Sequence, residues 1–395
     1  MGRVLVTGAS GYIGSHVVVE LLNSDYSVFA LGNASGTPLP VPPTLSQFQV
    51  IPDSRDLSSL PPSLQNARQL TANKGDLKFG RCNLLLRDRI DELFQQESFD
   101  SVIHLASLKG VADSVANPLE FYMANLRSTL NLLTVCKEHG VSDLIFASSA
   151  TVYGVPEEIP IREDSMVGRD ITNPYGYSKW MIETMIKDMC NAAARGGASE
   201  DGLRAIILRI FDPAGGHPSG LLGESGPPKH LMPFISHVAL GKYPHLSIYG
   251  NHFPTADGTG ERDFVHIMDV ARAHVLALER LKELKEEGVR GRAEVYNLGL
   301  GKGHTVLEMV EEFEKASGLK VGANDWIATG STGELLRGIK IPVKLCAPRV
   351  GDVASIYCDP TAAREQLKWT PEYGIREICR DIWKFCQSQR TTNHQ

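Results

Sequence analysis

Long hydrophobic runs are missing from this sequence of 395 residues, and so is any run of basic residues. No uninterrupted apolar stretch reaches the roughly 18 residues that a membrane-spanning helix needs. The strand-like run at 3–7 begins almost at Met1 and leaves no room for a signal peptide. Val6 stands where a myristoylation signal has Ser or Thr. We therefore expect a soluble, cytoplasmic protein with no membrane partner.

The cysteines are few and scattered. There are seven of them, an odd number, and none forms a C-x-x-C pair. This pattern disfavours both a disulfide framework and a zinc site, so we predict a reducing compartment and no metal. The net charge of -6 argues against a nucleic-acid partner, because binding to phosphates needs clustered Lys and Arg.

What the first half of the sequence does contain is an alternation of strand-like and helix-like segments. The strand-like segments lie at 4–7, 27–31, 101–105, 143–148 and 204–209, and the clearest helical patterns at 12–22 and 126–139. Such alternation is typical of a parallel sheet with helices on both faces. We therefore expect an α/β fold with a Rossmann-type doubly wound parallel sheet.

The pattern changes after residue 211 to Gly- and Pro-rich loops, short strands and helical stretches at 269–287, 306–317 and 375–389. This predicts a smaller C-terminal substrate-binding lobe at 212–389, partly interleaved with a first domain at 1–211. Residues 40–78, rich in Pro, Ser and Gln, are predicted to be an exposed loop insertion. Residues 390–395 are predicted to be a frayed tail.

Three glycines lie where the first strand meets the first helix. They are Gly8, Gly11 and Gly14, with Tyr12 and Ile13 between the last two. Gly8 allows a tight turn, Gly11 allows close approach of a pyrophosphate, and Gly14 allows the helix to pack on the sheet. A glycine triplet alone also fits a simple turn, but this position favours a dinucleotide at the helix N-terminus.

The choice of dinucleotide depends on the end of the second strand, which reads Ala30-Leu31-Gly32-Asn33. An acidic residue that would bind the adenosine ribose is absent there, and Asn33 is the substitute donor or acceptor. No Arg or Lys lies between Asp25 and Asp53, so a 2′-phosphate finds no counter-charge in this segment. The sequence therefore favours NAD over NADP.

A Ser, a Tyr and a Lys form the candidate catalytic group. Ser149 follows the strand at 143–148, and Tyr175 and Lys179 stand at i and i+4 in NPYGYSK. This spacing puts both side chains on one face of a helix. A positive charge beside Tyr175 would lower the pKa of its phenol and make it a general base, with Ser149 bridging the proton transfer. A packed Tyr beside a surface Lys is the structural alternative.

By these residues the chain resembles the extended short-chain dehydrogenase/reductase family, and within it the UDP-glucose (UDP-galactose) 4-epimerases, along nearly its whole length. The matching stretches include 11–22, 102–122, 148–154, 173–179, 230–234, 257–271, 296–306 and 351–357. The resemblance implies that Tyr175 removes the proton from the sugar 4-hydroxyl while hydride passes from C4 to NAD. The 4-keto sugar then turns and receives the hydride on its other face.

The resemblance also assigns the binding residues. The NAD-binding set is Gly8, Gly11, Tyr12, Ile13, Gly14, Asn33, Leu105, Lys109, Asn125, Tyr175 and Lys179. The UDP-sugar set is Ser149, Phe211, Asp212, His230, Leu231, Tyr249, Arg262, Arg349 and Asp352. Within it, the two arginines are expected to face the diphosphate and Asp352 a ribose or uridine hydroxyl. A homodimer is expected only because the family commonly pairs through two helices.

Departures from the family pattern concentrate in these sites. Gly32 and Asn83 replace acidic residues near the adenosine, and Asp212 and His230 replace asparagines near the UDP-sugar. A carboxylate near a diphosphate is repelled unless it is protonated or faces elsewhere. Ile356 stands where the family varies the room for an N-acetyl group. A different nucleotide sugar, such as a UDP-N-acetylhexosamine or a UDP-pentose, therefore stays open.

Two rival functions were weighed against a 4-epimerase. A nucleotide-sugar 4,6-dehydratase needs a carboxylic acid at the positions of Ala150 and Thr151, which cannot supply one. A non-catalytic NAD-binding regulator fits the missing ribose acid, but Ser149, Tyr175 and Lys179 are all present. The predicted function is thus the reversible 4-epimerisation of a UDP-hexose.

Overall fold

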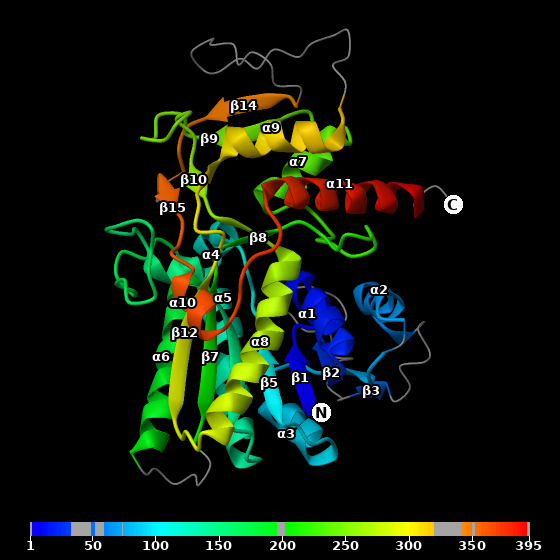
Figure 1. Ribbon diagram of the computed structural model, residues 1–395, viewed down its shortest axis with the longest axis vertical. Coiled ribbons are helices and arrows are strands. Elements are labelled where there is room, and N and C mark those ends of the chain that lie inside the picture. The colour runs from blue at the N-terminus through cyan, green and yellow to red at the C-terminus, as the bar shows by residue number, and fades with distance from the viewer. Residues whose placement is uncertain are drawn as a thin grey trace.

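The computed structural model describes residues 2–32, 49–51, 59–72, 74–195, 202–319, 341–349 and 352–392. Figure 1 shows a lower part built on a central sheet and an upper part formed by short strands and helices. The upper part contains α7 (Leu231–Ala239), α9 (Val306–Ser317) and α11 (Ile375–Thr392).

The central sheet confirms the predicted parallel, doubly wound α/β fold. Its described strands, in spatial order, are β12 (Arg292–Leu298), β7 (Arg204–Ile210), β6 (Asp143–Ser149), β5 (Ser101–His104), β1 (Arg3–Thr7), β2 (Ser27–Gly32), β4 (Leu77–Arg81) and β3 (Gln49–Ile51). All neighbouring pairs are parallel except β3 with β4. The strand order reverses between β1 and β5, and ligands of such sheets bind at the carboxyl edge beside that reversal.

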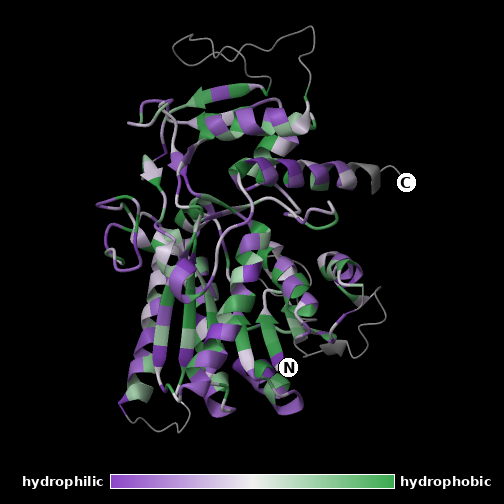
Figure 2. Ribbon diagram, in the orientation of Figure 1, coloured by the Kyte–Doolittle hydropathy of each residue, from purple (hydrophilic) through white to green (hydrophobic). Residues whose placement is uncertain are grey.

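Helices cover both faces of the sheet, and a separate apolar core lies under each layer. One layer contains α1 (Tyr12–Asn23) and α8 (Ile267–Glu286), and the other contains α3 (Arg87–Gln96), α5 (Pro118–Glu138) and α6 (Pro174–Ala194). Strands β1, β6 and β7 are buried almost throughout because both of their faces are covered. In Figure 2 strands β1 and β7 are mainly hydrophobic, whereas α11 mixes hydrophobic and hydrophilic residues.

The prediction of a loop at 40–78 is wrong for the second half of this range. Residues Pro62–Leu70 form helix α2, and strand β4 begins at Leu77. Leu64 and Ala67 of α2 are fully buried in the core that also contains α1. Tertiary packing thus stabilises a short helix whose polar composition suggested a loop. Residues 40–48, 52–58 and 73 lie outside the described residues.

The chain returns to the first domain after residue 211. The helix predicted at 269–287 is α8, and it belongs to the sheet domain rather than to the C-terminal lobe, because its apolar side packs on α1 and the strands. Strand β12 then joins the sheet edge beside β7. The boundary predicted at 211 therefore separates the sheet domain from the C-terminal lobe only in part, because α8 and β12 follow it and belong to the sheet domain.

The C-terminal lobe has its own apolar core, formed by α7, α9, α11 and the paired strands β9 (Leu246–Tyr249) and β14 (Val343–Cys346). Among the described residues, five further short strands lie between it and the sheet domain. They are β8 (Asp212–Ala214), β10 (Glu261–Arg262), β11 (Phe264–His266), β13 (His304–Thr305) and β15 (Ser355–Ile356). Helix α11 runs to Thr392, so the frayed tail predicted from 390 begins too early, and 393–395 lie outside the described residues.

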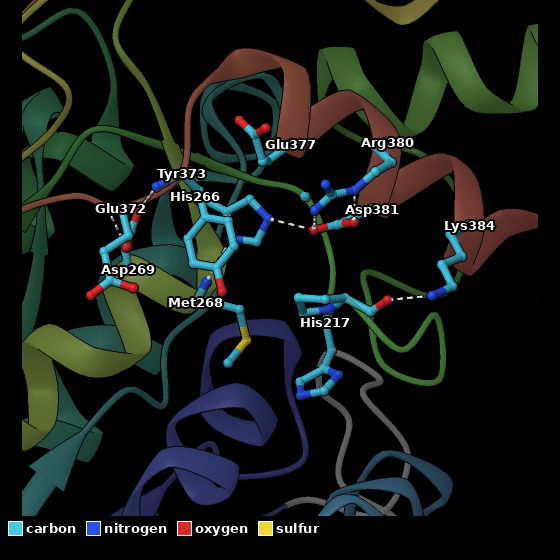
Figure 3. A network of polar contacts seen from close by, with 12 residues as sticks. His217, His266, Met268, Asp269, Glu372, Tyr373, Glu377, Arg380, Asp381 and Lys384 are labelled. Carbon is cyan, nitrogen blue, oxygen red and sulfur yellow. Dashed lines mark hydrogen bonds and ion pairs between the residues drawn. The ribbon is translucent and has the colours of Figure 1, made fainter. Parts of the chain in front are cut away.

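A buried polar network joins α11 to the start of α8 (Figure 3). His266 Nε2 lies 3.4 Å from Asp381 Oδ2, and both side chains are almost fully buried. The Met268 N–H donates to His266 Nδ1, which leaves the proton on Nε2 to face Asp381. Arg380 holds the same carboxylate through two hydrogen bonds. Tyr373 stacks on the His266 ring with centroids 4.3 Å apart.

No helix within the described parts of the chain is both long enough and apolar enough to cross a membrane. All seven cysteines are free thiols, and every one except Cys346 is buried.

Candidate active site

The glycine loop has no room for side chains at its key positions. Gly8 has a φ of +70°, and a Cβ there would lie 2.8 Å from the Ala106 N atom. A Cβ on Gly14 would lie 2.2 Å from the Gly8 carbonyl oxygen, and one on Gly11 would lie 3.2 Å from the same atom. Glycine at these positions therefore allows the tight turn and the close packing of α1, and the three glycines line a cavity at the N-terminus of α1, where a pyrophosphate can bind.

The loop is fixed to the neighbouring strand by Thr7. Its hydroxyl accepts hydrogen bonds from the N–H groups of Leu105 and Ala106, each at 3.2 Å. Tyr12 donates its hydroxyl to the Gly215 carbonyl at 2.9 Å, so the loop also contacts the segment that leads into the C-terminal lobe. Asn33, the predicted substitute for a ribose acid, lies outside the described residues.

The Ser, Tyr and Lys of the predicted catalytic group converge at the carboxyl end of β6. Tyr175 lies in the first turn of α6. Asn173, which caps the N-terminus of this helix, accepts a hydrogen bond from the Gly176 N–H at 2.8 Å. The Lys179 ammonium lies 5.7 Å from the centroid of the Tyr175 ring and donates to the Ala147 carbonyl at 2.7 Å. The Tyr175 hydroxyl shares a hydrogen bond with Ser149.

The protein residues around Tyr175 shift its pKa upward, and the predicted lowering, which also depends on the charge of an oxidised nicotinamide, stays a prediction. Burial raises the pKa of Tyr175 to about 12, and the hydrogen bond from Ser149 opposes this only partly. Burial also lowers the pKa of Lys179 to about 7. Because desolvation disfavours the charged form of each group, the tyrosine rests as a neutral phenol beside a lysine that readily gives up its proton.

Asn125 does not touch the cavity directly. Its side chain accepts from the Leu108 N–H at 2.8 Å and donates to the Leu108 carbonyl and to Ser178 Oγ. It therefore fixes the loop after β5 against α6. Leu105 and Lys109 of that loop do line the cavity, and the Lys109 ammonium pairs with Glu224 at 2.8 Å.

The predicted UDP-binding residues meet on the other wall. The Arg349 guanidinium stacks 3.9 Å from the centroid of the Tyr249 ring, and Asp352 accepts from the Arg349 N–H at 3.1 Å. The Arg262 guanidinium donates to the Glu261 carbonyl. These groups form a cationic and aromatic surface that suits a diphosphate and a base.

The departures Asp212 and His230 face this same wall. Burial raises the pKa of Asp212 above its usual range, while the charges of Arg262 and His230 oppose the rise. Burial lowers the pKa of His230, and Glu224 opposes that shift. His230 immediately precedes α7, whose first residue is Leu231.

A single cavity of about 1290 Å³ unites these walls. Of the predicted site residues, Asn125 does not line it and Asn33 is not described, and all the others do: Gly8, Gly11, Tyr12, Ile13, Gly14, Leu105, Lys109, Ser149, Tyr175, Lys179, Phe211, Asp212, His230, Leu231, Tyr249, Arg262, Arg349 and Asp352. Its volume exceeds the range of about 300–1,000 Å³ that is usual for a single small molecule.

Two further lining residues were missed by the sequence reasoning. The Thr151 hydroxyl is buried without a hydrogen-bond partner among the described residues and lines the cavity. Its position two residues after Ser149 was the signal that could have found it. Glu224 lies between Lys109 and His230, and nothing in its Gly- and Pro-rich surroundings marked it.

Comparison with known proteins agrees with this geometry. The profile of the NAD dependent epimerase/dehydratase family matches residues 4–299. The UDP-glucose 4-epimerase of Caenorhabditis elegans is 41% identical over 97% of both chains. The human UDP-glucose 4-epimerase is also 41% identical, over 97% of this chain and 96% of its own.

Solved structures give the same result. The UDP-glucose 4-epimerase of Bifidobacterium longum, solved with NAD+ and UDP, is 34% identical, covers 98% of this chain and 99% of its own, and superposes with a TM-score of 0.79. That of Stenotrophomonas maltophila, solved with NAD and formylated UDP-arabinopyranose, is 31% identical with a TM-score of 0.80 over 99% of this chain and 100% of its own. The chain therefore belongs to the NAD-dependent epimerase/dehydratase family.

Proposed function

We propose that this protein is an NAD-dependent 4-epimerase that interconverts UDP-glucose and UDP-galactose. The observation that carries the proposal is one cavity lined by the glycine loop, by Tyr175 and by the two arginines Arg262 and Arg349. A dinucleotide and a nucleotide sugar can lie in this cavity together, with the sugar ring between the dinucleotide and the UDP. Relatives at 41% identity over nearly the full chain bear the name UDP-glucose 4-epimerase.

The residues of the glycine loop, with Leu105 and Lys109, hold NAD in this proposal. When bound, NAD accepts a hydride from the sugar C4 and returns it, and brings a positive charge into the cavity. Gly8, Gly11 and Gly14 line the cavity at the start of α1, and without side chains they let the backbone approach the pyrophosphate.

Tyr175 moves the proton of the sugar 4-hydroxyl. Its oxygen, hydrogen-bonded to Ser149, would accept that proton as a phenolate during oxidation and, as the resulting phenol, give it back after the sugar has turned. Lys179, fixed by the Ala147 carbonyl at 2.7 Å, supplies positive charge when protonated and so favours the phenolate. Burial keeps these groups away from water, which strengthens their mutual electrostatic effects.

The far wall holds the UDP and leaves the sugar free to turn. Arg262 and Arg349 suit the diphosphate, since guanidinium groups bind such oxygens with paired hydrogen bonds. Tyr249, stacked on Arg349, adds an aromatic face. Asp352 accepts a hydrogen bond from a hydroxyl group of the uridine. Phe211, Asp212, His230 and Leu231 border the sugar. A carboxyl at Asp212 favours a sugar that presents a donor there.

Two properties of the assembly and location are part of the proposal. Exposed apolar side chains gather along α4 (Val111–Ala116) and α5, namely Val111, Val115, Leu119, Met123 and Leu130. A patch of this kind suits contact with a second copy of the chain, so we propose a homodimer.

The free thiols suit a reducing compartment, which supports a cytoplasmic location.

The test is to incubate the purified protein with UDP-galactose, and separately with UDP-N-acetylgalactosamine, with and without added NAD. Formation of the 4-epimer is followed by chromatography. We expect conversion of UDP-galactose by the native protein and a loss of at least about 100-fold in Tyr175→Phe, the usual contribution of a positioned acid–base group. If NAD-loaded protein converts neither sugar, the proposed activity is wrong and the protein is a binding protein or acts on another sugar.

A further inference from the structure

A buried carboxylate lies behind the proton-transfer group formed by Ser149, Tyr175 and Lys179. Glu183 follows Lys179 by four residues in α6, so both side chains extend from one face of the helix. The Glu183 side chain is only 1% exposed. Burying a charge costs free energy unless the charge is paired and hydrogen-bonded, so the contacts of Glu183 indicate its role.

Both oxygens of Glu183 are held by an arginine on the central sheet. Arg209 of β7 donates from Nε to Glu183 Oε1 at 3.0 Å and from Nη2 to Oε2 at 2.8 Å, the paired geometry that joins a guanidinium to a carboxylate. Arg209 also donates to the Tyr153 hydroxyl at 2.8 Å. Burial raises the pKa of Glu183, but the hydrogen bonds and the charge of Arg209 outweigh burial and hold this pKa below its usual range. The carboxylate is therefore charged and fixed in position.

The same carboxylate holds strand β6 near its carboxyl end. Ser148 Oγ donates to Glu183 Oε1 at 2.6 Å, and Ser148 is in register with Arg209 in the parallel pair of β6 and β7. Ser148 is itself buried. Helix α6 and strands β6 and β7 therefore meet at Glu183, which fixes the position of Ser148.

Ser148 lies between two residues of β6 that contact the proton-transfer group. On one side, the Ala147 carbonyl accepts a hydrogen bond from the Lys179 ammonium at 2.7 Å. On the other side, Ser149 is hydrogen-bonded to Tyr175. Because consecutive Cα atoms keep a fixed separation, a displacement of Ser148 would disturb both contacts together.

The charge of Glu183 also acts on Lys179. Burial lowers the pKa of Lys179 to about 7, and the negative charge of Glu183 opposes this fall. His104 of β5 faces Lys179 as well but is neutral near pH 7, because burial lowers its pKa to about 3. Arg209 and Lys187, whose ammonium lies 3.1 Å from Glu183 Oε2, share the carboxylate and weaken its effect on Lys179, but they do not remove that effect.

From this arrangement we infer that Glu183 is a positioning residue for proton transfer. It acts through Ser148 on the end of β6, and through its charge on Lys179. Glu183 does not line the cavity, whereas Ser148 and Lys179 do, so Glu183 acts through these residues rather than on a ligand. This inference rests on the proposed function, in which Tyr175 moves the proton and Lys179 favours its phenolate.

The first test removes the contact with β6 and keeps the buried ion pair. Ser148→Ala leaves Glu183 paired with Arg209, so the variant should fold, and thermal unfolding checks this. With NAD-loaded protein and UDP-galactose, kcat should fall about tenfold, because a small misplacement of catalytic groups costs this much or more. KM should change by less than about twofold, since the lost contact serves the transition state. The matched control is Ser142→Ala: Ser142 accepts from Arg204 at 2.8 Å just before the start of β6, and this variant should keep the native kcat.

The second test removes the charge and needs no sugar. In Glu183→Gln the pKa of Lys179 should fall by about one further unit, the effect of losing a nearby opposite charge. The unfolded lysine keeps its pKa near about 10.4, so the unfolded chain binds the extra proton from a lower pH upward. The rise of the free energy of unfolding with pH should therefore begin about one pH unit lower, as urea unfolding from about pH 5.5 to about pH 9 measures. In a Lys179→Met background the same substitution should not move the start of the rise.

A native kcat in Ser148→Ala, an equal loss of kcat in Ser142→Ala, or an unchanged start of the rise in Glu183→Gln would each overturn the inference. If Glu183→Gln does not fold, Ser148→Ala decides alone. Failure of the proposed function is a different result, in which native NAD-loaded protein converts no UDP-galactose. The unfolding measurement then still decides whether Glu183 acts on Lys179.

Discussion

At the scale of single residues, burial controls the ionisation of the groups that move protons. Tyr175 and Lys179 lie on consecutive turns of α6, and the pKa of each shifts toward its neutral form because burial disfavours the charged form. In the proposed mechanism the positive charge that activates Tyr175 therefore comes from the bound cofactor together with Lys179.

Lys179 gives a prediction for the pH dependence of stability. Its pKa is lowered to about 7 in the folded protein, whereas an unfolded lysine titrates near about 10.4. Between these values the unfolded chain binds one more proton than the native chain, so the free energy of unfolding rises with pH, by up to about 1.4 kcal/mol per unit. Lys179→Met should flatten this rise in urea unfolding between pH 7.5 and pH 9.

The matched control for that measurement is Lys137→Met, since Lys137 is exposed near the end of α5. It should keep the native slope. A slope that is the same in native protein and in Lys179→Met would show that Lys179 stays protonated in the fold.

At the scale of elements, the start of α6 positions the catalytic tyrosine. Asn173 is buried and its side chain accepts from the Gly176 N–H at 2.8 Å. We expect Asn173→Ala to lower the free energy of unfolding by about 1 kcal/mol, the usual effect of losing such a cap. Denaturant unfolding measures it. Asn191→Ala, at an exposed position near the end of the same helix, should change stability by less than about 0.5 kcal/mol.

The docking of α11 depends on one buried carboxylate. The hydrogen bonds from His266 and Arg380 hold the pKa of Asp381 below its usual range, although burial opposes this. Asp381→Asn should destabilise the protein by about 1–3 kcal/mol, because a neutral amide accepts the hydrogen bonds of His266 and Arg380 less strongly than the buried carboxylate does. The depressed pKa means that this stabilisation is present at neutral pH and is lost only as the pH falls through the folded pKa, below about 3.9.

Thermal unfolding at pH 7 compares this variant with Asp164→Asn, whose ion pair with Arg162 is exposed. The exposed pair should contribute less than about 1 kcal/mol. Similar losses in the two variants would contradict a special role for the network in Figure 3.

At the scale of the whole molecule, the apolar patch on α4 and α5 predicts the oligomeric state. Leu119 is 81% exposed, and a second copy would cover it. Light scattering coupled to gel filtration should give the mass of a dimer for the native protein and of a monomer for Leu119→Glu. Glu138→Gln, at the far end of α5, should remain dimeric. A native monomer at micromolar concentration would rule out the proposed homodimer.

The order of the motifs made the fold predictable from the sequence. Strand-helix alternation, the glycines at the first junction and the Tyr175–Lys179 spacing all follow from local periodicity, which is written directly in the chain. Helix α2 was not predictable in this way, because its polar composition resembles a loop and its stability comes from burying Leu64 and Ala67 against α1. Helix α8 was predicted as a helix but placed in the wrong domain, since periodicity does not say where an apolar face packs.

The sequence by itself thus determined the parallel sheet, the glycine loop of the dinucleotide site and the residues proposed to transfer the proton. Only the tertiary structure decided that burial raises the pKa of Tyr175, that Asn125 fixes a loop rather than touching the cavity, and that β12 pairs with β7. The physical reason is that motifs record neighbours along the chain, whereas desolvation and pairing between strands depend on residues that are distant in sequence and adjacent in space.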